Sequence, residues 1–429
     1  MEGELVAVVT KGHGDDHVGG EPIIRDSYNM AYMIHFVLGV GNLLPWNTFI
    51  TAVDYFGHLY PSKHINKVFS VVYMGSSLLV LVLMMSWSSW CWMPNFRCRM
   101  NVGLVMFALS LIAIPLIDWM CVGDGSLERV DVTYRVTVAA VTVCGLADGL
   151  VGGSLIGSAG KLPKRYMQAI FSGTASSGVL VCIFRIITKA SLPRTPQGLR
   201  ASAHLYFAVG TFIMLVCIIC CNIVDKLLVM QHYKQKAVPG THISHFSDYL
   251  PSSPTIPSHV NEPMKGPRFW HVAKEIRWAA LGILSIYTVT LSIFPGFITD
   301  EVESHLLQDW YPILLITMYN ISDLVGKSLP AIYAMKSIGK ASCASVARLL
   351  FYPLFTACLH GPKWLRTEVP LVFATAALGL TNGYLTSVLM MLAPKSVPVA
   401  EAETAGIVMA MFLCIGLVAG SVLGWFWII

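Results

Sequence analysis

The chain has 429 residues, of which 55% are hydrophobic and only 12% are charged, and its formal net charge is +5. Soluble domains carry roughly 25% charged residues, so this composition excludes an ordinary soluble protein and indicates a membrane protein. The positive charge is modest and spread over short loops. This distribution is typical of orientation in a lipid bilayer rather than of nucleic-acid binding.

The N-terminal stretch, residues 1–28, is polar and Gly-rich, without the basic segment and apolar core of a cleavable signal peptide. Apolar runs then follow in about eleven places, each close to the roughly 20 residues that a helix needs to cross a bilayer. They lie near 29–53, 68–92, 102–121, 133–158, 166–188, 203–224, 273–298, 309–335, 341–359, 369–393 and 404–427. The sequence therefore predicts an all-α membrane protein.

One long polar stretch, 225–270, separates the apolar runs into two groups and is rich in Pro, Ser and His. It cannot bury enough apolar surface to fold alone, so we expect a disordered cytosolic linker. An N-terminal bundle of about six helices would occupy 29–224 and a C-terminal bundle of about five would occupy 271–429.

The distribution of Lys and Arg in the loops places residues 1–28 in the cytosol and, with an odd number of spans, the C-terminus on the other side. We expect the protein in the plasma membrane. The vacuole or another internal membrane stays open as the alternative, because spans in both kinds of membrane have the same hydrophobic pattern.

Enzyme and metal signatures are missing from the sequence. It holds no H-E-x-x-H, G-x-S-x-G or G-x-x-x-x-G-K-[ST] motif, which disfavours a membrane enzyme and an ATP-driven pump. About eleven spans also disfavour a seven-helix receptor. The eleven cysteines lie mostly in apolar runs, and the Cys217–Cys220 spacing has no second pair, so we expect no metal and no cofactor. A carrier remains.

Asp323 and Lys327 lie in the middle of an apolar run, four residues apart, so they share one face of a helix. A charge at mid-bilayer costs about 2.5–3.5 kcal/mol or more and needs a partner, water or a function. One interpretation is a neutralised pair that joins two helices. The other, which we favour, is a substrate clamp in which the carboxylate accepts from sugar hydroxyls and the ammonium donates to oxygen. Asn320 lies on the same face.

Asp148 lies within another apolar run and has no base at helical spacing. A lone buried carboxylate suits a group that takes up and releases a proton, and pairing with Arg185 is the structural alternative. Asp148 is the first candidate for proton coupling, and His35 and Arg185 complete the candidate set. His35 also titrates near neutral pH, although a hydrogen-bonded packing role is more common. Pro45 and Pro295 interrupt two further runs, either as ordinary kinks or beside a substrate path.

Several stretches, from both halves and in order, resemble the equilibrative nucleoside transporter family. They are GVGNLLPWNTFITAVDYF (39–56), GSLIGSAGKLPKRYMQAIFSGTASSG (153–178), FPGF (294–297), YNISDLVGKSL (319–329) and LTNGYLTSVLMMLAPKSVPVAEAETAGIVMAMFLCIGLVAG (380–420). The resemblance implies an eleven-helix, major-facilitator-like 6+5 fold and alternating access around a central nucleoside site in a monomer. Carried over by position, the substrate residues would be Leu43, Trp46, Ile50, Met74, Phe294, Asn320, Asp323 and Lys327.

The sequence departs from the family pattern at three positions. Lys327 stands where nucleoside-selective animal members commonly have arginine, and Gly152 stands where a glutamine reads the nucleobase. Asp148 occupies a position that is often small. The stretch around Asp148 is most similar to the plant type-1 branch, whose members are described as proton-coupled, so protons are the expected coupling ion and a purely equilibrative facilitator is the alternative. It is also similar to a branch that carries organic cations, but Thr174 replaces the acid found there, which favours nucleosides.

Overall fold

The computed structural model describes residues 26–60, 65–86, 95–121, 127–193, 195–224, 226–236, 269–294, 307–362, 365 and 367–427. Over these residues the chain is all-helical. The elements of the N-terminal half are η1 (Ser27–Asn29), α1 (Met30–Thr51), α2 (Val53–Leu59), α3 (Ile65–Ser86), α4 (Phe96–Cys121), α5 (Leu127–Gly160), α6 (Lys164–Ser191), α7 (Pro196–Val224) and α8 (Leu228–Lys236). Those of the C-terminal half are α9 (Phe269–Glu275), α10 (Arg277–Ile293), η2 (Gln308–Trp310), α12 (Tyr311–Ser328), η3 (Leu329–Ala331), α13 (Ile338–Ala347), η4 (Arg348–Leu350), α14 (Phe351–His360), α15 (Glu368–Leu392), η5 (Ala393–Lys395), η6 (Val399–Glu401) and α16 (Ala402–Trp427).

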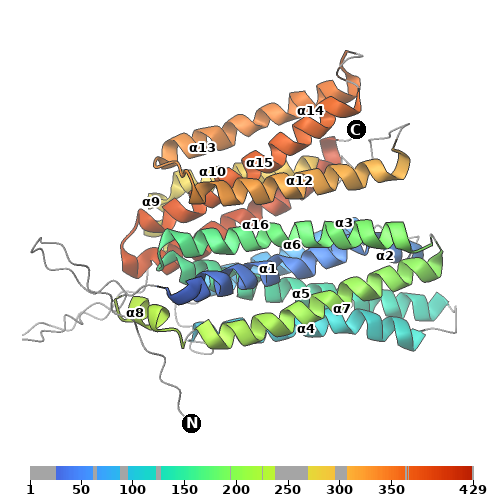
Figure 1. Cartoon of the computed structure of the whole chain (residues 1–429), viewed down its shortest axis with the longest axis horizontal. Helices are drawn as coiled ribbons and strands as arrows, with labels where there is room; N and C mark the ends of the chain where they lie inside the picture. The colour runs from blue at the N-terminus through green and yellow to red at the C-terminus, as the bar shows by residue number, and fades with distance from the viewer. Residues whose placement is uncertain are drawn as a thin grey trace, which may run out of the picture.

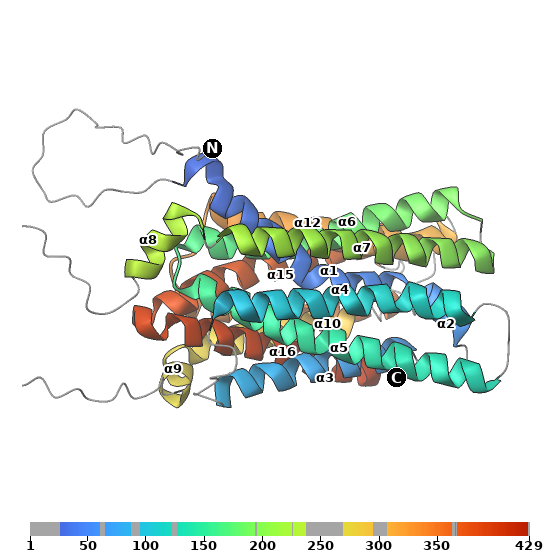
Figure 2. The same cartoon turned by 90° about the horizontal axis from the view of Figure 1, so that it is seen from below.

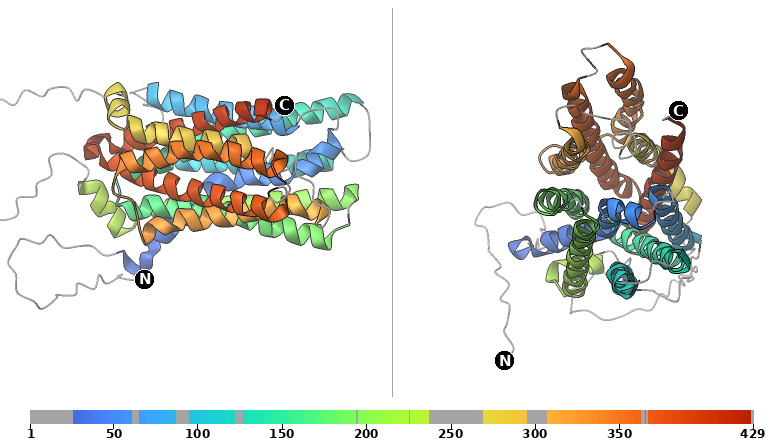
Figure 3. Two further views of the ribbon diagram at one scale, coloured as in Figure 1. Left: turned by 90° about the horizontal axis from the view of Figure 1, so that it is seen from above. Right: turned by 90° about the vertical axis from the view of Figure 1, so that its right-hand side faces the viewer.

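The long helices lie side by side along one common direction (Figures 1 and 2). Viewed down that direction, the N-terminal helices, blue to green, gather on one side and the C-terminal helices, yellow to red, on the other (Figure 3, right). The two groups meet where α16 packs on α3 and α5, and where α12 and α15 pack on α6. The start of α1 and the end of α16 lie at opposite ends of the bundle (Figure 1).

Close helix packing explains the small residues of the sequence. A Cβ atom added at Gly39 would lie 2.2 Å from the carbonyl oxygen of Ile170, and one added at Gly173 would lie 2.1 Å from that of Phe36. Such distances are impossible for real atoms, so α1 and α6 approach each other only because both positions are glycine. Backbone contact of this kind is how helices associate inside a membrane, where burial of apolar surface supplies little drive.

Among the described residues, nine helices are long and apolar enough to cross a membrane, or ten if the bent pair α9 and α10 counts as one span. The expected number of eleven is therefore not confirmed by length and composition. The run expected at 309–335 forms α12, which has 18 residues and carries Asn320, Asp323 and Lys327. Its polar side chains lower its apolar character, although it lies alongside the other long helices (Figure 1).

The described helices do not break at the proline positions that the sequence singled out. Helix α1 continues through Pro45 without interruption, while Pro295 lies outside the described residues. The sharp bend of the seventh run, 75° between α9 and α10, occurs at Ile276. Within the range expected to be a linker, residues 228–236 form α8 and α9 begins at Phe269; residues 237–268 lie outside the described part.

Candidate functional site

Asp323 and Lys327 form an ion pair within α12. The Lys327 Nζ atom lies 2.8 Å from Asp323 Oδ2, as their spacing on one helix face predicts. Asp323 is 5% exposed and Lys327 is 4% exposed. Two charges buried so deeply need further hydrogen bonds to offset the lost hydration. The surrounding helices supply these bonds.

Helix α15 supplies the second partner of the carboxylate. The Asn382 amide donates to Asp323 Oδ1 at 2.7 Å, and Asn382 is itself buried. This contact depends on the neighbouring residue, because a Cβ atom added at Gly383 would lie 2.2 Å from the carbonyl oxygen of Asp323. The glycine lets α15 approach α12 until the short Asn382 side chain reaches the acid. Both carboxylate oxygens are thereby held by groups of the C-terminal bundle.

Arg348 extends the network away from the pair. Arg348 is 3% exposed, and its guanidinium donates to Thr290 Oγ1 on α10 at 2.8 Å, while Thr290 in turn donates to Asn382 Oδ1 at 2.9 Å. Three helices and η4 are thus joined by one chain of hydrogen bonds that ends on Asp323. The network holds two cations and one acid, so its net formal charge is positive.

On its other side, the ion pair faces α6 of the N-terminal bundle. Lys327 Nζ lies 3.4 Å from Thr174 Oγ1, and Ser172 Oγ donates to the Lys327 carbonyl at 3.3 Å. One turn away, Asn320 donates to Cys182 Sγ at 3.3 Å. The predicted clamp therefore lies at the contact between the two bundles.

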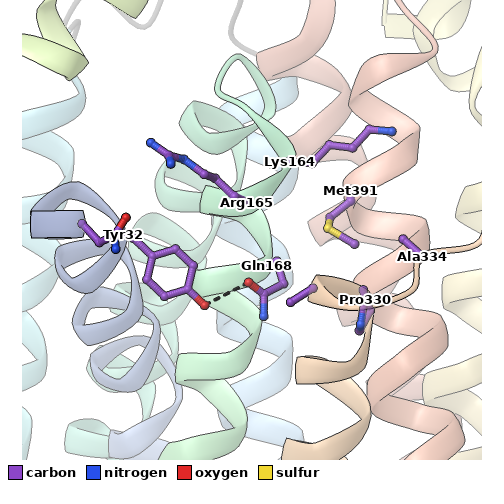
Figure 4. Close-up of a pocket in the computed structure, with 9 residues that line it drawn as sticks. Tyr32, Lys164, Arg165, Gln168, Pro330, Ala334 and Met391 are labelled. Carbon is purple, nitrogen blue, oxygen red and sulfur yellow. Dashed lines mark hydrogen bonds between the residues drawn. The ribbon is translucent and has the colours of Figure 1, made fainter. Parts of the chain in front are cut away.

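A cavity of about 400 Å³ opens between the bundles near the start of α6 (Figure 4). Its polar wall includes Tyr32 and Gln168, whose side chains share a hydrogen bond of 2.9 Å. Its apolar wall includes Pro330 and Met391 from the other bundle. The Gln168 amide also donates to Ser172 Oγ at 3.0 Å, so the cavity connects through one hydroxyl to the backbone of Lys327. None of the eight predicted substrate residues lines this cavity.

The apolar residues predicted around the substrate fall into separate groups. Trp46 packs its ring on Tyr73 of α3 at 4.6 Å, and Met74 accepts through its carbonyl from Cys414 Sγ of α16 at 3.5 Å. Leu43 and Ile50 are half-buried on α1 near Trp46. Phe294 stacks on Tyr319 of α12 at 4.0 Å. Met74 and the ion pair thus both lie where the two bundles meet. Met74 lies at the contact of α3 with α16, and the ion pair lies at the contact of α12 with α6.

The three candidates for proton coupling lie apart. Asp148 on α5 accepts from Ser77 Oγ of α3 at 2.7 Å. Pairing of Asp148 with Arg185, the structural alternative, is wrong: Arg185 bonds to Asp54 at 2.6 Å and to the Thr51 carbonyl at 2.7 Å. Its guanidinium reaches the Thr51 carbonyl at the end of α1 and Asp54 in the first turn of α2, because it lies on the face of α6 that packs on α1.

His35 is buried, as the packing interpretation expects. Its Nδ1 lies 2.6 Å from the Ala31 carbonyl, and its ring packs on Tyr166 at 5.1 Å. Its described contacts are those of a helix-packing residue, and they leave its proposed role in proton coupling a prediction.

Gly152 leaves space that Asn42 of α1 fills. A Cβ atom added at Gly152 would lie 3.3 Å from Asn42 Oδ1. That oxygen is buried and has no hydrogen-bond partner among the described residues. Where the family pattern has a glutamine in the fourth span, this chain has Gly152, and the carboxamide of Asn42 from the first span lies beside that position.

Sequence reasoning missed Asn382, Arg348 and Gln168. Asp323 stands out in the sequence because burying a charge in a membrane is costly. The same argument applies to Arg348, which lies inside the apolar run 341–359, so the sequence contains the signal that identifies it. Asn382 and Gln168 are uncharged, so only the fold reveals their partners.

Comparisons with known proteins supply evidence that is independent of this geometry. A sequence model of the family described as nucleoside transporter matches residues 138–429. The chain is 57% identical over 405 residues to Equilibrative nucleotide transporter 8 of Arabidopsis thaliana, covering 94% of this chain and 97% of that protein. It is 49% identical over 405 residues to Equilibrative nucleotide transporter 1 of the same plant, covering 94% and 87%.

Solved structures share the fold at low sequence identity. The proton:xylose symporter XylE bound to 6-bromo-6-deoxy-D-glucose superposes with a TM-score of 0.60 at 12% identity, covering 94% of this chain and 89% of that one. The human organic anion transporter MFSD10 gives 0.54 at 12% identity, covering 93% and 94%. Both likenesses establish a major facilitator fold and nothing about the cargo.

Proposed function

We propose that this chain, which belongs to the nucleoside transporter family, carries nucleosides across a membrane by alternating access. It is a multi-pass helical membrane protein with a major facilitator fold, and the relatives it matches are named as transporters rather than enzymes. The observation that carries the proposal is the buried Asp323–Lys327 pair at the contact of α12 with α6.

The chemistry of this pair suits the ribose of a nucleoside. Asp323 is an acceptor, while Lys327 has three N–H donors, and together they complement a hydroxyl, which both donates and accepts. Asn320 adds a carboxamide on the same helix. The aromatic and sulfur surfaces of Trp46, Met74 and Phe294 would cover the nucleobase in a state of the carrier in which the bundles have moved.

The charge of the network disfavours an organic cation, the competing class of substrate. Lys327 and Arg348 outnumber Asp323, and Thr174 is uncharged, so a cation would meet net repulsion in a low-dielectric site. A neutral nucleoside avoids this repulsion, and a phosphate would complement it. The attraction between a phosphate and this positive network agrees with the word nucleotide in the names of the Arabidopsis relatives. A nucleotide is therefore the second candidate substrate.

Proton coupling is the finer part of the proposal. Asp148 is a partly buried acid whose described bond is to the neutral Ser77 hydroxyl. Among the residues that the structure describes, no cation pairs with this carboxylate, so it can exchange a proton during the cycle. His35 and Arg185 are the lesser candidates. A purely equilibrative carrier is the alternative, in which Asp148 only joins α3 to α5.

We also propose that the protein acts as a monomer, with the starts of α1, α4 and α16 facing the cytosol and the end of α16 on the other side. The excess of Lys and Arg in the loops supports this orientation. The plasma membrane is the proposed location, and the vacuolar membrane is the alternative.

The test is uptake of radiolabelled adenosine, uridine, AMP and a monoamine by cells that lack nucleoside transport, at an acidic and at a neutral external pH. We expect saturable nucleoside uptake that rises at acidic pH. Saturable monoamine uptake without nucleoside uptake would overturn the substrate class, and equal nucleoside uptake at both pH values would overturn proton coupling alone.

A further inference from the structure

Arg348 is a buried cation without an acid beside it. Among the described residues, no carboxylate lies within 4.0 Å of its guanidinium. Instead it donates to four neutral oxygens on α10 and α15: Thr290 Oγ1 at 2.8 Å, the Ile286 carbonyl at 2.9 Å, the Leu378 carbonyl at 3.1 Å and Thr381 Oγ1 at 3.2 Å. A buried charge normally has a charged partner, and the nearest acid in the network, Asp323, is reached only through other side chains.

The hydrogen bonds from Arg348 to Asp323 have one possible direction. A guanidinium has no acceptor, so Thr290 Oγ1 must accept from it, and the Thr290 hydroxyl proton then points onward to Asn382 Oδ1. Asn382 must therefore turn its NH₂ group towards Asp323 Oδ1. Each bond polarises the next in the same sense, which strengthens the chain in a low-dielectric interior. The cation at one end and the carboxylate at the other, which has no donor, thus impose the same orientation on the Asn382 carboxamide.

We infer that Arg348, Thr290 and Asn382 form a positioning relay that holds the Asp323 carboxylate in the orientation that receives the ribose hydroxyls. The inference rests on the proposed function, since it assumes that Asp323 binds substrate. The relay occupies Oδ1 with a neutral donor and leaves Lys327 on Oδ2. The ammonium is then not the only group that holds the acid, and its remaining N–H groups are available to the substrate or to Thr174.

Two threonines make a matched pair for the test, because both accept from Arg348 but only one lies in the relay. Thr290 passes the hydrogen bond on to Asn382, whereas the Thr381 hydroxyl donates to the Ala377 and Leu378 carbonyls of its own helix. Thr290→Val and Thr381→Val remove the same hydroxyl with the same change of shape. A role of Arg348 limited to joining helices predicts the same effect for both variants.

The measurement is the KM and maximal rate of uptake for adenosine and for 2′,3′-dideoxyadenosine, normalised to the amount of carrier in the membrane. Thr290→Val removes a hydroxyl that accepts from a charged group and passes the bond on to Asn382, so it is expected to raise the adenosine KM about tenfold. The dideoxy analogue lacks the hydroxyls that Asp323 receives, so its KM should change less than about twofold. Thr381→Val should change neither KM by more than about twofold.

The relay is overturned if Thr290→Val and Thr381→Val have equal effects, or if Thr290→Val raises both KM values alike. Asn382→Leu, which removes the bond to Asp323 directly, keeps the test decisive if Thr290→Val does not reach the membrane. Its expected signature is the same selective loss for adenosine. If the wild-type chain shows no saturable nucleoside uptake, the proposed function fails and the relay with it. If Asp323→Asn transports adenosine with the wild-type KM, nucleoside transport stands, but the assignment of Asp323 to the substrate site fails, and the relay fails with that assignment. If Asp323→Asn loses uptake while Thr290→Val and Asn382→Leu behave as wild type, the relay alone is refuted.

Discussion

The Asn382 amide on α15 donates to Asp323 Oδ1 on α12 at 2.7 Å. Together with Lys327 on Oδ2 at 2.8 Å, this bond holds the acid entirely within the C-terminal bundle. The contacts of α12 to α6 across the bundle boundary are longer, 3.3 Å at Ser172 and 3.4 Å at Thr174. In the proposed transport cycle the ion pair would therefore move with the C-terminal bundle, and the bonds of α12 to Ser172 and Thr174 on α6 would break before the shorter ones that hold Asp323.

Lys327→Met should destabilise the protein more than the double variant Lys327→Met/Asp323→Asn. Removing one partner leaves a buried charge uncompensated, which costs about 3–5 kcal/mol, whereas removing both charges is close to neutral. Thermal unfolding in detergent, followed by intrinsic fluorescence, measures the difference. A double variant less stable than Lys327→Met would contradict the pairing.

Gly383→Ala should separate α12 from α15 and lower stability, because the new Cβ atom would meet the Asp323 carbonyl oxygen at 2.2 Å. Gly75→Ala on α3 is the control, since nothing lies within 4 Å of a Cβ atom there. Alanine favours a helix by about 1 kcal/mol over glycine, so the control should gain slightly in melting temperature. Similar changes in both variants would refute the close approach.

The positions of the spans could be predicted from apolar length alone. Each expected run overlaps a helix or a pair of helices, because the bilayer sets the length of each run before any tertiary contact is known. The bend at Ile276 could not be predicted, since no proline or glycine marks it. Of the two prolines that the sequence singled out, Pro45 lies within the described residues and leaves α1 continuous, because neighbouring helices can satisfy the freed carbonyl.

Glu403→Gln should open the end of the bundle where α4 and α16 begin. Glu403 bonds to Arg99 at 3.0 Å and to Lys161 at 2.5 Å, and so joins the two bundles. Two partly exposed pairs are worth roughly 1 kcal/mol together. We expect a membrane-impermeant maleimide to label an introduced Met391→Cys about fivefold faster in inside-out vesicles.

Labelling of the protein that lacks the Met391→Cys substitution measures the background that comes from the native cysteine thiols. Glu401→Gln is the control variant, because Glu401 pairs only with exposed His271, at 3.8 Å, among the described residues. Equal labelling of the two variants would show that Glu403 does not hold this end closed.

Asp148→Asn should abolish the rise of nucleoside uptake at acidic external pH, because an amide neither gains nor loses a proton in this range. His35→Gln should keep that rise, as expected for a packing residue bonded to the Ala31 carbonyl. Uptake across a series of external pH values compares the two variants. Persistence of the full pH dependence in Asp148→Asn would exclude it as the coupling group.

The candidate site was predictable only in part. Asp323 and Lys327 stand out because each is a charge inside an apolar run, and their spacing fixes their contact. The bond from Asn382 to Asp323 joins residues 59 positions apart, and no periodicity within one helix reports it. The sequence alone could not tell whether Arg185 pairs with Asp54 or with Asp148. Only the packing of α6 on α1 shows that Asp54 is its partner.

Uptake of radiolabelled adenosine by Asp323→Asn, at matched abundance in the membrane, tests the central claim most directly. The amide keeps the shape of the acid but loses its charge and one acceptor, and charge-assisted bonds are worth about 1.5–3 kcal/mol each. We predict a KM raised at least about tenfold, or no saturable uptake. An unchanged KM and maximal rate in this variant would contradict the assignment of Asp323 to the substrate site.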